Sequence, residues 1–184
     1  MLDPSADIPL RHRRWCGIVG NVVVLHQRDL ADVTSLLRAL RQQLPGIVTT
    51  EGSGDWYLFY DPYGTTVPEQ RFPFCTLMTG DRYDGASNLD RDIGTYRVNL
   101  GLDRHGYEDL FGPAPRQAAG YGVIDTGFDY TATDVVMPHP FYAPLHWVCV
   151  VNPGERTCTA LADLLERAYA IAERIYHNRR RRRD

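Results

Sequence analysis

A polar loop in the middle of the chain carries most of the residues that could bind or transform a ligand. The stretch 80–92 reads GDRYDGASNLDRD, and the segment after it adds two more polar side chains. Arginine grips a carboxylate or phosphate through parallel N–H groups, and a neighbouring aspartate can act as a base. We expect Asp84 to be that base and the ligand to be held by Asp81, Ser87, Asp90, Arg91, Arg97 and Asn99. The same residue types are ordinary turn formers, so a purely structural role for this loop stays open.

A second candidate lies in the stretch MPHPFYAPLHW at 137–147. His139 stands between two prolines, which restrict the backbone to an extended form. Because imidazole titrates near neutral pH, His139 is a candidate acid–base residue. Tyr142 and Trp147 follow it and could stack on a planar ligand. The alternative is structural: the prolines set the entry to a strand and His139 hydrogen-bonds the backbone.

Together these segments predict a pocket for a small polar or anionic ligand, with Arg71 as a further contact. Whether a reaction follows binding stays open. The chain has no lysine, which excludes a lysine Schiff base and a P-loop. It also lacks the GxGxxG, CxxCH and GxSxG patterns, so we expect no cofactor and no serine nucleophile of that type. Oxygen ligands are plentiful in the 81–91 loop, but no EF-hand or zinc spacing is present, so we predict no metal site.

The elements that must position these residues can be predicted from hydrophobic spacing. Leucines and valine recur at helical intervals over 30–44, and a second apolar helix pattern runs from 161 to 175. Between them we predict strands at 47–50, 55–60, 72–79, 95–100 and 147–151, a short helix at 104–111 and a short strand at 123–124. In the segment 95–100, Val98 and Leu100 should face one way and Arg97 and Asn99 the other. This order predicts an α+β domain, with an antiparallel sheet of about five or six strands covered by the N- and C-terminal helices.

Several stretches also carry a resemblance to a known family. They are LPGIV (44–48), FYDP (59–62), RFPFCTLMTGDRYDGASNLDR (71–91), YRVNLG (96–101), LFGP (110–113) and MPHPFYAPLHWVCVVNPGE (137–155). In this order they resemble the bacterial family called domain of unknown function 6194, over about residues 29–178. That family is distantly similar to the MmcQ/YjbR group, small proteins with a terminal helix pair on an antiparallel sheet. Some members of the wider group are described as DNA-binding, but the resemblance implies no settled activity.

Charge is distributed unevenly along the chain. Residues 29–178 hold 11 arginines and 20 acidic residues, a net charge of −9, while five arginines follow at 179–183. An acidic body disfavours a nucleic-acid groove on the fold itself, because phosphate contacts need a basic face. The arginine-rich tail, 179–184, could still contact nucleic acid or an acidic protein. We keep this as the alternative function.

The start of the chain is ambiguous. Residues 11–25 combine a basic cluster with a short apolar run, which fits a non-native extension, an extra edge strand at 18–25 or a weak signal peptide. We expect residues 1–28 to lie outside the domain formed by 29–178. The four cysteines show no CxxC pair, which favours reduced thiols in the cytoplasm, and no apolar run is long enough for a membrane span. The oligomeric state stays open.

Overall fold

An antiparallel sheet forms the centre of the computed structural model, which describes residues 22–67, 70–82, 85–116 and 122–182. In this described part of the chain the sheet has six strands: β1 (Ile47–Gly52), β2 (Asp55–Tyr60), β3 (Cys75–Met78), β4 (Arg97–Gly101), β5 (Met137–Pro138) and β6 (Trp147–Val151). Their spatial order is β1-β2-β3-β4-β6-β5, and every neighbouring pair runs antiparallel. The predicted α+β class and strand number are confirmed.

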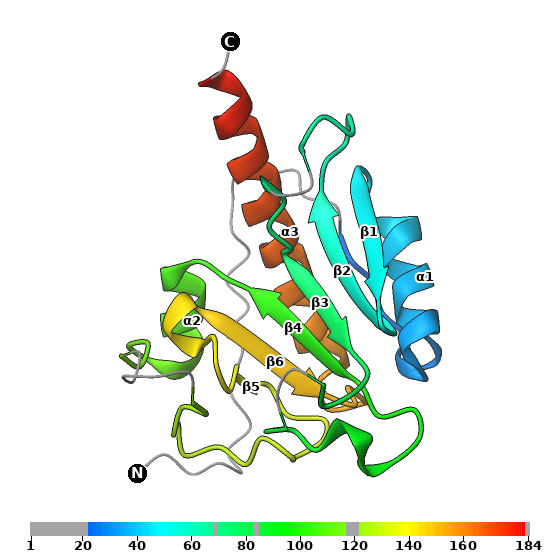
Figure 1. Ribbon diagram of the computed structural model, residues 1–184, viewed down its shortest axis with the longest axis vertical. Helices are drawn as coiled ribbons and strands as arrows, with labels where there is room; N and C mark the ends of the chain where they lie inside the picture. The colour runs from blue at the N-terminus through cyan, green and yellow to red at the C-terminus, as the bar shows by residue number, and fades with distance from the viewer. Residues whose placement is uncertain (1–21, 68–69, 83–84, 117–121, 183–184) are drawn as a thin grey trace.

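Two helices cover one face of this sheet. Helix α1 (Val33–Gln43) and helix α3 (Cys158–Arg181) lie behind the sheet in the view of Figure 1, and the shorter α2 (Arg104–Phe111) lies near one end. Helix α1 begins after Asp32, whose side chain caps it by accepting a hydrogen bond from the backbone N–H of Ser35 at 2.7 Å. Short 3₁₀ helices are also present at Gln27–Leu30, Leu89–Arg91 and Ala143–Leu145.

The main hydrophobic core lies between the sheet and these two helices. Alternate residues of the central strands face it, including Leu77, Val98, Leu100, Val148 and Val150. They pack against helix residues that are also fully buried, such as Leu36, Leu40, Leu161 and Leu165. The helical and strand periodicities read from the sequence therefore meet in one core.

The opposite face of the central strands is covered as well, by the long connections before β4 and before β5. A second apolar cluster lies there, made of Met78, Leu89, Tyr130, Met137, Cys149 and Val151. Arg97 and Asn99 point to this face, as the alternation predicts, yet both are buried. An antiparallel sheet usually leaves one face in water, so a sheet covered on both sides is the main architectural difference from the expectation.

Other expectations change in detail. Strand β3 is shorter than 72–79, because Phe72 is exposed and Pro73 cannot donate a ladder hydrogen bond. The predicted strand at 123–124 is absent, and the backbone N–H of Ile124 instead donates to the carbonyl of Pro140.

The described residues nearest the two ends of the chain are more closely tied to the domain than the sequence suggests. Val23 and Leu25 belong to the main core, and the N–H of Val23 donates to the Glu166 carboxylate at 2.6 Å. Residues 1–21 and the last two residues lie outside the described part, and so does most of the apolar run proposed as a strand or signal peptide. Helix α3 continues through Arg181, so the first arginines of the predicted tail are helical. Across the described residues, no helix is both long and apolar enough to cross a bilayer.

Candidate functional site

The residues predicted to bind a ligand separate into three places. One group lies beneath the loops on the sheet face that α1 and α3 do not cover. Arg97 is 1% exposed and donates from Nη1 to the Ser87 hydroxyl at 2.7 Å. Asn99 is equally buried, and its Nδ2 donates to the Thr76 hydroxyl at 2.9 Å. Ser87 is fully buried, so this group is closed to solvent.

His139 belongs to the same buried group. Its Nδ1 accepts the backbone N–H groups of Phe141 and Tyr142, at 3.1 and 3.2 Å, so the ring proton resides on Nε2. Burial, together with the positive charge of Arg97, holds the pKa of His139 well below its usual value. The neutral ring therefore shapes the turn after Pro138, as the structural alternative expected. A catalytic role for His139 stays a prediction.

Two aromatic residues predicted to stack on a ligand instead surround this imidazole. The Tyr142 and Trp147 rings lie with their centroids 4.8 and 6.5 Å from that of His139. Tyr142 is half exposed, so its outer surface is accessible. Imidazole and guanidinium thus converge as the sequence suggested, but inside a packed layer.

The second place is the acidic loop, 80–92, whose residues bond to one another. The N–H of Asp90 donates to the Asp81 carboxylate at 3.2 Å, and the N–H of Asp81 donates in return to Asp90 at 3.4 Å. Arg91 pairs with its neighbour Asp92 at 3.4 Å. These contacts close the loop on itself. Asp84, the predicted base, lies outside the described residues.

The third place is an open groove of about 610 Å³ between the segment 61–74 and the second half of α3. It contains Arg71 and Trp147, two of the predicted ligand contacts. The most buried residues in its lining are Phe74, Leu102 and Ala168, so its base is apolar. The volume suits a small organic molecule. Figure 1 shows the second half of α3 rising beyond the sheet beside the loop that follows β2.

The charged side chains that line this groove in the described part of the chain are all positive. Three arginines line it, Arg71, Arg179 and Arg180, and none of the described lining residues is acidic. This is unusual on a body whose net charge is strongly negative. A groove of this composition attracts anions.

Arg71 is the most firmly positioned of the three. Its Nη2 lies 3.1 Å from the carboxylate of Asp61, and its Nε donates to the Thr66 carbonyl at 3.0 Å. Asp61 is buried and also accepts the N–H groups of Thr65 and Thr66, which fixes the loop beneath the guanidinium. The remaining terminal nitrogen, Nη1, has no partner among the described residues, so it can donate to a ligand.

The end of α3 is fastened to the same loop. Arg179 donates to the carbonyl of Gln70 at 3.3 Å and lies over the ring of Phe72, with 5.5 Å from Cζ to the ring centroid. Arg180 lies over Tyr63 at 4.7 Å. These cation–π contacts place two of the sequence's terminal arginines at the mouth of the groove.

Tyrosines provide neutral polar groups along the groove. The Tyr60 hydroxyl donates to Glu173 at 3.3 Å, and burial followed by the Glu173 charge raises the pKa of Tyr60 to about 12. Tyr176 shares a hydrogen bond with Thr65 at 2.9 Å. The Tyr60 phenol therefore stays protonated at neutral pH.

Sequence reasoning did not find the groove. Its only local signal is that the apolar pattern of α3 continues to Ile175, which is 44% exposed, opposite the exposed Phe72. Two large apolar side chains exposed at one place often mark a binding surface. Their proximity depends on segments about a hundred residues apart, which a single sequence does not reveal.

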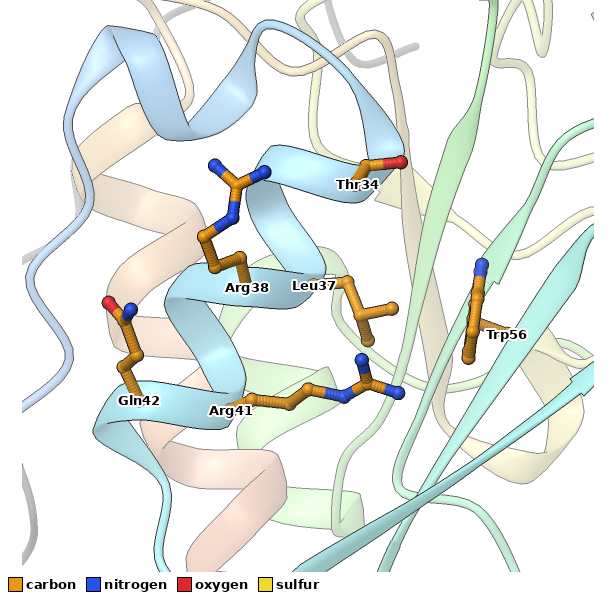
Figure 2. Close-up of a pocket in the computed structure, with 6 residues that line it drawn as sticks. All are labelled: Thr34, Leu37, Arg38, Arg41, Gln42 and Trp56. Atoms are coloured by element: carbon orange, nitrogen blue, oxygen red, sulfur yellow. The ribbon is translucent and has the colours of Figure 1, made fainter.

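A smaller hollow of about 290 Å³ lies between α1 and the sheet (Figure 2). The side chain of Arg41 reaches from α1 toward Trp56, with its Cζ 5.1 Å from the ring centroid. Arg41 also donates to the hydroxyl of Thr49 on β1. Arg38, one turn earlier, extends into solvent.

Comparison with known proteins assigns the chain to a family. The model of a family described as "Family of unknown function (DUF6194)" matches residues 31–182. The chain belongs to this family. The family match includes every residue of the groove, but its description gives no activity. In the same comparisons no curated protein and no solved structure matches the chain.

Proposed function

We propose that this protein binds a small organic anion with an apolar body in the groove between residues 61–74 and α3. The observation that carries the proposal is the lining: an apolar base, three arginines and, among the described residues, no carboxylate. The acid group of the ligand would accept hydrogen bonds from Arg71 and Arg179, and its apolar part would lie on Phe74 and Trp147. This retains the ligand class expected from the sequence but moves the site away from the 81–91 loop.

Burial supports placing the site in the groove rather than at the 81–91 loop. Neither of the two cavities described above is lined by the 81–91 loop or by His139. A ligand that reached Arg97 would have to displace a packed layer, whereas Arg71 keeps about a fifth of its side chain exposed. Arg71 is also held in place before binding, which lowers the entropic cost of gripping an anion.

The proposal can be tested with the fluorescent probe 8-anilinonaphthalene-1-sulfonate, which combines an aromatic body with an acid group. Ala172→Trp should abolish binding because the indole fills the groove. Arg71→Met and Arg179→Gln should each weaken binding about tenfold, since each removes a charge-assisted hydrogen bond. Arg91→Gln, which removes an exposed arginine outside the groove, should bind as the wild type does.

Two further measurements make this experiment decisive. Decanoate should displace the probe and decanol should not, because only the first carries a charge. Binding should change the tryptophan emission of the wild type and of Trp56→Phe, but not of Trp147→Phe. The proposal is overturned if Ala172→Trp melts at the wild-type temperature and still binds the probe with wild-type affinity.

The alternative function, contact with nucleic acid through the arginine-rich end, is supported by one observation. Arg180 to Arg182 are exposed at the end of α3, which extends beyond the sheet. Removing residues 179–184 should then abolish salt-sensitive retention on a DNA or RNA column. Retention that is unchanged by the truncation excludes this alternative.

We also propose that the protein is related to MmcQ/YjbR-like proteins, that it is bacterial and that it is cytoplasmic. The support for the relationship is the architecture, in which helices near both chain ends pack on one antiparallel sheet. A solved structure of an MmcQ/YjbR-like protein with the same strand order would strengthen it.

A further inference from the structure

The outer edge of β1 is an unpaired sheet edge. Strand β1 ends the sheet and pairs with β2 on one side, and none of the described residues pairs with its other side. It is six residues long, contains no proline and carries a single charged residue, Glu51. Such an edge presents free N–H and C=O groups to another strand, and proteins usually protect it with lysine, proline or a bulge.

The side chains beside this edge carry opposite charges. Thr49 pairs with Leu58 and Glu51 with Trp56, so both β1 residues point to the sheet face that α1 covers. Arg41 of α1 reaches this face, where it contacts Trp56 and Thr49 (Figure 2). Within the described part of the chain, neither Arg41 nor Glu51 forms an ion pair. Both are exposed at the rim of the small hollow or next to it.

We propose that a second copy of this chain pairs with β1 across a two-fold axis, which joins two sheets into one. In an antiparallel pair, residues directly opposite one another share a face. With Thr50 of both copies on the axis, the partner's Glu51 lies opposite Thr49 and within reach of Arg41. The symmetry forms this ion pair twice. A second copy therefore supplies hydrogen-bond partners for the backbone at the outer edge of β1. It also supplies an oppositely charged partner for Arg41 and for Glu51.

The short length of β1 indicates a reversible dimer. Five residue pairs of β1 would join, and the exposed parts of Arg38, Arg41 and Trp56 would add side-chain contacts around them. Interfaces at the small end of the usual range dissociate readily, so the dimer should form as protein concentration rises. The groove that we propose for ligand binding contains none of these residues, so the two proposals stand independently.

Reversing the charges of Arg41 and Glu51, singly and together, tests the dimer directly. Sedimentation velocity over a wide concentration range should show a monomer–dimer equilibrium for the full chain. Arg41→Glu and Glu51→Arg should each weaken dimerisation about tenfold, because each brings like charges together twice. The double variant restores opposite charges and should return to within about threefold of the wild type. Arg28→Glu, an exposed reversal away from β1, should leave the equilibrium unchanged.

Folding of each variant is verified by thermal unfolding, which should be close to that of the wild type because both positions are exposed. The proposal is overturned if the wild type is monomeric at every concentration. It is equally overturned if a dimer persists in both single variants, or if the double variant associates no better than either of them.

Discussion

At the scale of single residues, the least expected feature is a polar layer inside the fold. Arg97, Asn99 and His139 are all nearly inaccessible, although such side chains are usually exposed. Each has at least one hydrogen-bond partner: the Ser87 hydroxyl for Arg97, the Thr76 hydroxyl for Asn99 and two backbone N–H groups for His139. These partners offset part of the cost of removing polar groups from water. Protonation of a buried group in this layer should therefore destabilise the fold.

Stability should depend on pH through His139. In the unfolded chain its imidazole takes up a proton near pH 6.5, whereas in the folded protein burial and Arg97 keep it neutral to lower pH. The unfolded state then binds more protons, so the free energy of unfolding should fall as pH decreases from about 6.5 to the lowered folded pKa. The loss from this group should approach about 1.4 kcal/mol per pH unit.

Urea unfolding between about pH 7.5 and 5 measures this slope. His139→Gln lacks the titrating ring and should show a shallower slope, whatever its stability at pH 7.5. His26→Gln, at an exposed position, is the matched control for replacing a histidine by glutamine. Equal slopes for the wild type and His139→Gln would contradict the assignment.

At the scale of elements, the start of α3 depends on a residue from a different segment. Thr157, the residue before the helix, makes no side-chain cap of its own. The Asp134 carboxylate instead accepts the N–H groups of Gly154 and Thr157 at 2.7 and 3.0 Å, and the Thr157 hydroxyl at 2.6 Å. Burial opposes ionisation of Asp134, but these hydrogen bonds prevail and lower its pKa. The connection before β5 is thereby fixed to the helix that forms the groove.

Asp134→Ala should lower the free energy of unfolding by about 3 kcal/mol, because it leaves several helix-start donors without their charged acceptor. Asp129→Ala is the matched control in the same connection. In the described part of the chain its carboxylate accepts hydrogen bonds only from Thr131, two residues away, and its loss should cost less than about 1 kcal/mol. Urea denaturation of the two variants measures both values, and equal costs would refute the capping role.

At the scale of the whole molecule, the sheet separates a large core from a small one. Met137 is fully buried on the side that the loops cover, just as Leu77 is on the helix side. The connections before β4 and β5 therefore act as a packed layer over the central strands. This makes the protein three layers thick at its centre.

Met137→Ala should consequently destabilise the fold about as much as Leu77→Ala, by roughly 2–5 kcal/mol, since both leave a cavity in a packed interior. Leu145→Ala, at an exposed position near the same loop, should change the free energy of unfolding by less than about 0.5 kcal/mol. Chemical denaturation compares the three. A nearly neutral Met137→Ala would mean that the loop-side cluster contributes little to stability.

Much of this architecture follows from periodicity alone. The leucine spacing of α1 and the alternation of Val98 and Leu100 with Arg97 and Asn99 predict both elements and the faces they present. Periodicity does not reveal that the Arg97 side is buried too, because the covering loops have no regular pattern. An alternating strand on its own indicates one wet face.

The candidate site was only partly predictable for a related reason. Arg71 and Trp147 were identified by residue type, and both line the groove. Their neighbours there come from α3, which reaches residues 61–72 through contacts such as Tyr176 with Thr65. No local signal in a single sequence reports a contact over such a separation. His139 was selected for its flanking prolines, which fit a rigid turn as well as they fit a catalytic residue.

The two halves of helix α3 have different roles: the first packs in the core and the second lines the groove. The buried positions of α3 end at Tyr169, and from Ile171 onward its inward side chains face the groove. Random mutagenesis of this one helix should therefore yield two classes of defect in sequence order. Substitutions in the earlier turns should reduce the yield of folded protein. Substitutions in the later turns should leave that yield unchanged and alter ligand binding.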